Sequence, residues 1–413
     1  MSKKEKKKVP QLRFPEFVEV LKLTYLDEIL DFKNGINADK SQYGKGYKFI
    51  NVLDIINDAP IYYESIIGSV EITEEEFLKN DVQYGDILFQ RSSEIREEAG
   101  QSNIYLDKNQ NATFGGFVIR GRPKVKFDPI YFNYLLKTQA IRKEITDRSG
   151  GSTRFNVGQN TLSEVPIFVS NSLAEQEKIA SFLGAVDTRL NQLRRKREHL
   201  QTYKRGVMQK IFSQKIRFPQ PDGSPFPAWE RKKLGELGEV IAGLTYSPSD
   251  VEKEGLLVLR SSNVQDGKLA FDDCVFVNTV VNSKSLSRES DILICVRNGS
   301  TNLIGKNALI PKNIPPSTHG AFMVIFRSNR NSFIFQLFQT DMYKRQVYQD
   351  LGARINSINS DRLRKYRFLI PCIEEQEKIA NFLTTLDRKI ETLSRQIDQT
   401  EQFKKGLLQK MFV

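Results

Sequence analysis

The chain has 413 residues, of which 39% are hydrophobic and 27% charged, and its formal net charge is +12 with a pI near 9.3. This length predicts two globular domains with connecting elements, and this composition excludes a disordered chain. The excess of Lys and Arg favours a polyanionic partner such as nucleic acid, with a basic protein that lacks such a partner as the alternative.

No run approaches the ~20 consecutive apolar residues of a membrane-spanning helix, and no apolar signal core follows the basic N-terminus. We therefore expect a cytoplasmic protein without a membrane partner. Residues 1–12 contain the lysine-rich run from Lys3 to Lys8, which predicts a basic, flexible tail.

Residues 13–172 carry strand-like runs after turn residues, such as Gly85-Asp86-Ile87-Leu88-Phe89 and Gly115-Gly116-Phe117-Val118-Ile119. These runs predict a mixed α/β domain. Polar and basic side chains follow the first run and gather again near the end of the domain, at Arg91, Ser92, Ser93, Ser152, Thr153, Arg154, Asn156 and Gln159.

A long helix is predicted over residues 173–214. Its apolar residues recur in steps of three and four, and it contains no proline. A helix of about 40 residues extends ~60 Å, far more than a globular helix usually does. The apolar seam begins with Ile179, Phe182, Val186, Leu190 and Leu193.

Residues 215–373 repeat the first domain in a diverged form. Arg217-Phe218-Pro219 matches Arg13-Phe14-Pro15, and Ser290-Asp291-Ile292-Leu293-Ile294 matches the run from Gly85 to Phe89. Polar and basic residues recur after the corresponding turns, at Arg297, Asn298, Arg354, Asn356, Ser357 and Asn359.

Residues 374–413 are a near-copy of the first long helix. The string EEQEKIANFL begins at residue 374 and AEQEKIASFL at residue 174, an offset of 200 positions, and at the same offset FKKGLLQKMF (403–412) matches YKRGVMQKIF (203–212). The second seam contains Ile379, Phe382, Leu386, Ile390, Leu393 and Ile397.

A single long helix would expose its apolar stripe, so we predict that the two helices pack as an antiparallel coiled coil. The predicted fold class is α+β, with two mixed α/β domains related by a pseudo-twofold axis and separated by these helices. The helices are alike and the domains have diverged. This indicates that the two domains are held in equivalent positions but recognise different features of their partner.

Sequence motifs for catalysis or metal binding are lacking. Gly305-Lys306 is followed by Asn307 and so does not form a phosphate-binding loop, and the cysteines Cys274, Cys295 and Cys372 lack the spacing of a zinc site. We therefore predict no catalytic residue, no metal site and no cofactor in this chain. A self-sufficient DNA-cutting or DNA-methylating enzyme remains as a rival that these missing motifs disfavour.

The triplet Glu-x-Lys occurs in some nucleases and appears twice, in Glu175-Gln176-Glu177-Lys178 and in Glu375-Gln376-Glu377-Lys378. We interpret both as first turns of helices, where carboxylates favour the positive end of the dipole and pair with Lys at helical spacing.

The polar clusters have the chemistry of DNA recognition. Arg binds guanine O6 and N7, Asn and Gln bind adenine, and Ser and Thr reach phosphates or bases. The alternative is ordinary solvated loops in which Asn and Ser form turns. Recurrence of the clusters at matching places in two diverged domains favours contact with double-stranded DNA.

In these features the chain resembles the specificity subunits of type I restriction–modification systems. The resemblance rests on the paired EQEKIA-x-FL helices that end in KRGVMQK and KKGLLQK, the Arg-Phe-Pro segments, and the Gly-Asp-Ile-Leu and Ser-Asp-Ile-Leu strands. It implies two target recognition domains, each reading one half of a bipartite DNA site. It also implies that the helices set the gap between the halves and dock a methyltransferase, and that the loops of Arg154 and Arg354 face DNA.

The resemblance further implies two methyltransferase subunits that use S-adenosylmethionine and two ATP-dependent motor-nuclease (restriction) subunits, with ATP and Mg²⁺ bound by these partners. The alternative from another class is a coiled-coil adaptor that binds protein only. Salt-dependent DNA binding would distinguish the two hypotheses.

Overall fold

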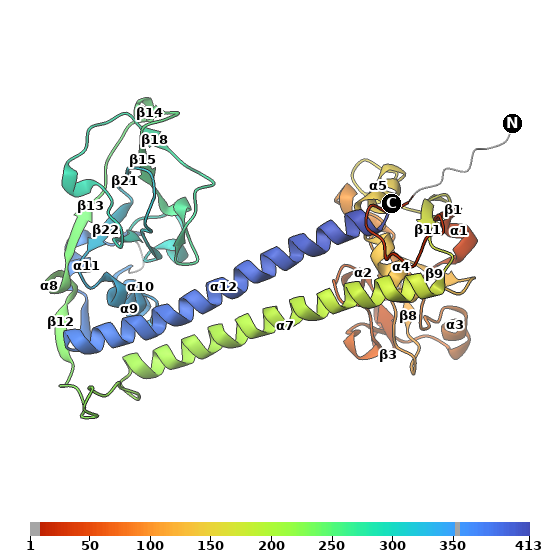
Figure 1. Cartoon of the computed structure of the whole chain (residues 1–413), viewed down its shortest axis with the longest axis horizontal. Coiled ribbons are helices and arrows are strands. Elements are labelled where there is room, and N and C mark those ends of the chain that lie inside the picture. The colour runs from red at the N-terminus through yellow and green to blue at the C-terminus, as the bar shows by residue number, and fades with distance from the viewer. Residues whose placement is uncertain (1–8, 352–355) are drawn as a thin grey trace. The chain divides into compact units, whose positions relative to one another are not determined.

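The computed structural model describes residues 9–351 and 356–413. The predicted tail up to residue 8 and the predicted contact residue Arg354 lie outside these residues. The chain divides into two compact units, one formed by Met1–Arg194 with Arg395–Val413 and the other by Arg195–Ser394. Each unit thus holds one globular domain and part of both long helices, which are labelled α7 and α12 in Figure 1.

The first unit is built around two sheets. The larger is antiparallel with the order β2-β9-β5-β7, formed by β2 (Leu30–Asn34), β9 (Val118–Pro123), β5 (Ile87–Gln90) and β7 (Ser102–Ile104). The smaller has the order β4-β3-β8, formed by β4 (Ser69–Val70), β3 (Tyr43–Ile50) and β8 (Thr113–Phe114). The pairing of β3 with β8 is parallel.

Short helices and an outer strand pair flank these sheets. The helices are α1 (Leu26–Ile29), α2 (Val52–Ile55), α3 (Glu74–Lys79), α4 (Pro129–Leu136), α5 (Gln139–Asp147) and α6 (Gln159–Ser163). Strand β1 (Lys22–Tyr25) pairs antiparallel with β11 (Pro166–Val169) and so joins the start of the domain to its end, just before α7.

The second unit repeats the larger sheet of the first, whereas its other sheet has four strands instead of three. Its antiparallel sheet has the order β13-β22-β19-β20, formed by β13 (Glu239–Ala242), β22 (Met323–Arg327), β19 (Ile292–Cys295) and β20 (Asn307–Leu309). Its other four-stranded sheet has the order β14-β18-β15-β21, formed by β14 (Val251–Glu252), β18 (Phe276–Val277), β15 (Leu256–Leu259) and β21 (Ser317–His319). The pairing of β15 with β21 is parallel, like that of β3 with β8.

One further strand pair of the second unit has a counterpart in the first. Strand β12 (Glu230–Lys233) pairs antiparallel with β23 (Arg367–Ile370), as β1 does with β11. The hairpin strands are β16 (Val264–Gln265) and β17 (Lys268–Leu269), and the helices are α8 (Leu234–Leu237), α9 (Asn331–Phe338), α10 (Asp341–Leu351) and α11 (Ser360–Lys365). The structure confirms the predicted repeat of two mixed α/β domains.

The same turn precedes an inner strand, β5 or β19, in the antiparallel sheet of each unit. Gly85 and Ser290 have positive φ angles of 88° and 66°, and the next residue is an aspartate that is 1% and 2% exposed, respectively. Asp86 pairs with Arg122 at 2.8 Å, and Asp291 pairs with Arg327 at 2.7 Å. Burial raises the pKa of Asp86, whereas the hydrogen bond from Arg122 acts in the opposite direction. The repeated Asp-Ile-Leu motif is therefore explained by this ion pair.

The long helices are α7 (Leu173–Phe212) and α12 (Ile373–Met411). They run antiparallel within each unit. In the first unit Asp187 pairs with Lys404 at 2.6 Å. In the second, Lys204 pairs with Asp387, also at 2.6 Å. Each ion pair is the copy of the other at the offset of 200 positions, and the predicted antiparallel packing is confirmed inside both units.

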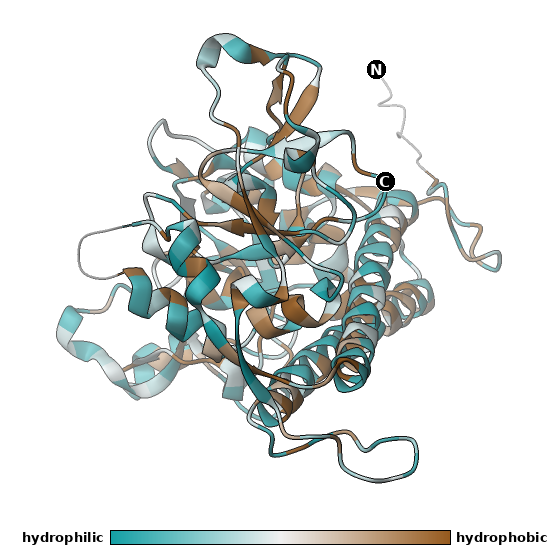
Figure 2. Cartoon of the chain, turned by 90° about the vertical axis from the view of Figure 1, so that its left-hand side faces the viewer, coloured by the Kyte–Doolittle hydropathy of each residue, from teal (hydrophilic) through white to brown (hydrophobic). Residues whose placement is uncertain are grey.

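Most seam residues are buried, among them Ile179, Leu190, Leu193, Ile379, Leu386, Leu393 and Ile397. Figure 2 shows both hydrophilic and hydrophobic colour along the long helices, as expected of amphipathic helices, and mostly hydrophobic strands in the middle of the view. Val186, Phe382 and Ile390 are half-buried. The prediction of Phe182 as a buried seam residue is wrong, because its side chain is exposed. Phe182 and Phe382 lie edge-on to Phe14 and Phe218 at centroid distances of 5.9 and 5.7 Å.

Each long helix begins at a buried ion pair that sequence analysis did not predict. Arg13 donates to both carboxylate oxygens of Glu175 at 2.6 and 2.8 Å, and Arg217 does so to Glu375 at 3.1 and 2.6 Å. Trp229 Nε1 also donates to Glu375 at 3.0 Å. The interpretation of both glutamates as partners of Lys at helical spacing is wrong, because the Arg of each Arg-Phe-Pro segment holds them instead.

None of the helices within residues 9–351 and 356–413 is both long and apolar enough to cross a bilayer. The backbone N–H of Leu12, at the end of the predicted tail, donates to Lys410 O at 2.9 Å.

Candidate DNA-recognition surfaces

In the first unit the two predicted polar segments lie side by side. Strand β6 (Ser92–Ser93) pairs antiparallel with β10 (Phe155–Asn156), so that Asn156 faces Ser92 in the register. The N–H of Val157 donates to Arg91 O at 2.9 Å and extends the pairing. Segments more than 50 residues apart in sequence thus form one surface.

The second unit brings its polar segments together in the same way. Arg297 and Ser357 form an isolated antiparallel bridge, and the N–H of Ile358 donates to Val296 O at 2.8 Å. Asn356 Nδ2 donates to Gly299 O at 3.3 Å. The equivalent pairing in both units explains why the polar clusters recur at matching places in the sequence.

Several predicted contact residues present their side chains to solvent. In the first unit Arg91, Ser152, Thr153, Arg154 and Asn156 are exposed. Arg154 forms a long ion pair with Glu94, with 3.7 Å between nitrogen and oxygen. In the second unit Arg297 and Asn356 are exposed and Ser357 is half-buried. Two of these exposed side chains also hydrogen-bond to the backbone: Arg91 Nη1 donates to Gly116 O at 3.3 Å, and Asn156 Nδ2 donates to Arg154 O at 3.1 Å.

Other predicted residues already hydrogen-bond within the chain. Ser93 is buried and donates to Glu98 at 2.8 Å. Asn298 donates to Ser261 Oγ at 3.0 Å and accepts from the N–H of Ser300. Asn359 caps α11 by accepting from the N–H of Asp361. Gln159, at the start of α6, is half-buried, with its side-chain amide against Phe32 O and Asn34. These four side chains stabilise the loops.

Sequence analysis missed an exposed phenylalanine beside each cluster. Phe117 is 64% exposed and Phe322 is 55% exposed. Their carbonyl oxygens accept from the backbone N–H groups of Arg91 and Arg297 at 2.9 and 3.1 Å. The Arg297 guanidinium also lies 5.5 Å from the centre of the Phe322 ring. The sequence signal is the Gly-Gly-Phe string at residues 115–117 and the Gly-Ala-Phe string at residues 320–322, of which the first predicts only a strand.

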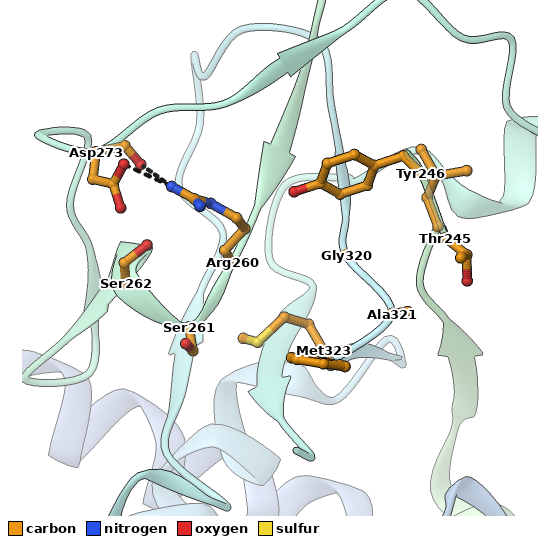
Figure 3. Close-up of a pocket in the computed structure, with 11 residues that line it drawn as sticks. Thr245, Tyr246, Arg260, Ser261, Ser262, Asp273, Gly320, Ala321 and Met323 are labelled. Carbon is orange, nitrogen blue, oxygen red and sulfur yellow. Dashed lines mark hydrogen bonds and ion pairs between the residues drawn. The ribbon is translucent and has the colours of Figure 1, made fainter. Parts of the chain in front are cut away.

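A hollow of about 530 Å³ lies in the second unit beside this cluster. It is lined by residues that follow β13, β15 and β21 in the chain, including Tyr246, Arg260, Ser261, Gly320 and Phe322. Figure 3 shows the Tyr246 ring extending toward Arg260, whose guanidinium is turned to Asp273. The hollow was not predicted from the sequence, although Arg260-Ser261-Ser262 repeats the string Arg91-Ser92-Ser93 after a buried strand.

His319 is the last residue of β21, directly before Gly320 in the wall of the hollow, and it has no exposed surface. Its Nε2 lies 3.0 Å from Ile241 O. Burial lowers the pKa of His319 to about 4. The buried, neutral imidazole of His319 therefore has a structural role and does not act as a general acid or base. In the part of the chain that the structure describes, no three His, Cys, Asp or Glu side chains are grouped to hold a metal ion.

Comparisons with known proteins agree with this architecture. The family model for the type I restriction modification DNA specificity domain matches residues 18–201 and again residues 228–402. A putative type I restriction enzyme MjaX specificity subunit of Methanocaldococcus jannaschii is 27% identical over 415 residues, covering 95% of this chain and 92% of the relative. The EcoKI specificity subunit of Escherichia coli K12 is 28% identical over 192 residues, covering 44% of this chain and 41% of the relative.

Solved structures share the fold. The S subunit of a type I restriction-modification system from M. genitalium superimposes with a TM-score of 0.62 at 17% identity, covering 98% of this chain and 99% of that one. A chain from a study of complex assembly and conformational transition of the type I R-M system gives a TM-score of 0.57 at 15% identity, covering 94% and 97%.

Proposed function

The chain belongs to the family of type I restriction modification DNA specificity domains, and we propose that each of its two units reads one half of a bipartite, gapped DNA site. As a specificity subunit it provides sequence-specific DNA recognition in a restriction–modification system and is not itself catalytic. The observation that supports one half-site for each unit is the repeat. The same scaffold occurs twice in the chain and presents different side chains each time.

In the proposal, the exposed polar residues of each cluster contact the duplex. Arg91, Arg154 and Asn156 serve the first half-site, and Arg297 and Asn356 serve the second. Exposure of these side chains and their repeated placement support this assignment. Arg reaches base edges or phosphates, and the net charge of +12 favours a polyanion at long range. Arg354, outside the described residues, remains a proposed contact.

The proposed complex contains two methyltransferase subunits and two motor-nuclease subunits, one of each kind for each repeat. S-adenosylmethionine, ATP and Mg²⁺ belong to those subunits, and the complex acts in the cytoplasm, where bacterial or archaeal DNA lies. The repeat in the helices supports two equal docking positions, since the ion pairs of Asp187 and Asp387 recur at the offset of 200 positions.

The test is DNA binding by the purified chain across a salt series. For the wild type we expect log affinity to fall linearly with log salt. Arg91→Ala and Arg297→Ala should each reduce that slope by about 0.9, as for one lost phosphate contact, or relax base preference at one position. Arg231→Ala, an exposed arginine on β12, is the matched control. No salt-dependent binding by the wild type would favour the protein-only adaptor.

A further inference from the structure

The hollow of the second unit is continuous with the proposed contact surface. Asn298 Nδ2 donates to Ser261 Oγ at 3.0 Å, which ties the wall of the hollow to the Arg297 loop. Phe322 lines the hollow and also lies under the Arg297 guanidinium. A group that enters the hollow therefore approaches across the surface that faces the duplex in the proposed function.

Arg260 stands in this hollow with one edge of its guanidinium held in place. Its Nη2 lies 2.6 Å from Asp273 Oδ1. Among the described residues neither Nη1 nor Nε has a hydrogen-bond partner, and Nε is fully buried. A guanidinium carries five N–H donors in a rigid fork, and an unpaired buried donor is costly. Because Nε is buried, the unpartnered donor that a ligand can reach is Nη1, which shares an edge of the guanidinium with the Nη2 held by Asp273.

The corresponding position of the first unit has a different side chain. Strands β3 and β15 both lie parallel to the strand before the Gly-x-Phe loop, and in both units the first glycine of that loop donates to the last strand residue. The residue that follows is Asn51 in the first unit and Arg260 in the second. Asn51 turns its side chain to the N–H of Leu53 and caps α2. The arginine is thus particular to the second unit.

We propose that Arg260, oriented by Asp273, reads a guanine in the half-site of the second unit. Guanine presents O6 and N7 as paired acceptors in the major groove, which is the acceptor pattern that an arginine fork matches. The aromatic rings of Tyr246 and Phe322 also line the hollow. This inference rests on the proposed function, because it requires the second unit to face DNA.

The experiment uses the full chain co-expressed with its methyltransferase subunit, and methylated adenines are mapped across the host chromosome. The wild type first gives the bipartite motif, and its absence would contradict the proposed function itself. Arg260→Ala should then relax one guanine position of one half-site and leave the other half and the gap unchanged. Arg231→Ala should leave the whole motif unchanged.

Duplexes that carry the mapped motif can test which atom of the guanine Arg260 contacts. Replacing the relaxed guanine by 7-deazaguanine removes the N7 acceptor and should weaken wild-type binding about tenfold. The same replacement should cost Arg260→Ala nothing further. Arg260→Lys keeps the charge beside Asp273 but not the fork, so it should lose the same guanine preference and serves if the alanine variant does not fold. An unchanged motif in a folded variant, or a second half-site without guanine, would overturn the inference.

Discussion

Glu375 is enclosed at the start of α12, where its side chain has no exposed surface and accepts hydrogen bonds from Arg217 and Trp229. Removing Arg217 leaves a buried carboxylate without its cation, which costs about 3 kcal/mol. We therefore expect Arg217→Met to lower the free energy of unfolding of the second unit by that amount. Urea unfolding followed by the fluorescence of Trp229, the single tryptophan, measures it.

The control is Lys232→Met, which breaks an ion pair with Glu230, a residue whose side chain is 72% exposed. Exposed pairs contribute little, so the change should stay within about 0.5 kcal/mol. Equal effects of the two variants would contradict the role assigned to the buried pair.

His319 predicts a pH dependence of stability in the second unit. Its pKa is lowered by burial to about 4 from its ordinary value of 6.5. The unfolded chain therefore binds a proton at His319 more readily than the folded chain does. The contribution of neutral His319 to the free energy of unfolding is fully present above pH 6.5 and is lost as the pH falls to about 4. The loss amounts to about 3 kcal/mol. His319→Gln should show a flatter curve in urea unfolding between these pH values, and parallel curves for both proteins would refute the assignment.

At the scale of elements, the two helix-to-helix ion pairs fix how α7 and α12 are aligned within each unit. Lys204 is 14% exposed and Asp387 is 39% exposed. Lys204→Asp places like charges together and should lower the stability of the second unit by about 1 kcal/mol, and the double exchange Lys204→Asp with Asp387→Lys should recover about half of it. Trp229 fluorescence reports both. A double variant no more stable than the single variants would contradict this alignment.

The elements differ in how far the sequence predicted them. The long helices and the repeat follow from local periodicity and a constant offset, which need no tertiary information. Two features of the site depend on tertiary contacts. One is the pairing of the Arg91 segment with the Asn156 segment, and the other is the approach of three separate segments around the hollow that contains Arg260. The Arg13–Glu175 pair joins residues far apart in sequence, and although both strings had been noticed as repeats, no local pattern links them.

At the scale of the whole molecule, the proposal treats the helices as the device that sets the gap between half-sites. Deleting one heptad, residues 194–200 from α7 and 394–400 from α12, removes about 10 Å of helix and keeps the seam in phase. We expect the gap to shorten by about three base pairs while both half-sites persist. Methylation mapping of the variant measures the length of the gap and the sequences of the half-sites. An unchanged gap would show that the helices do not set it.

A map of methylated adenines in cells that express this chain with its methyltransferase is the direct test of sequence-specific recognition by the two units. Sequence-specific recognition by two unlike units predicts one asymmetric motif, made of two short halves around a fixed gap. A complex that assembles and binds DNA but leaves no such motif would contradict that account and favour an adaptor without sequence-specific recognition.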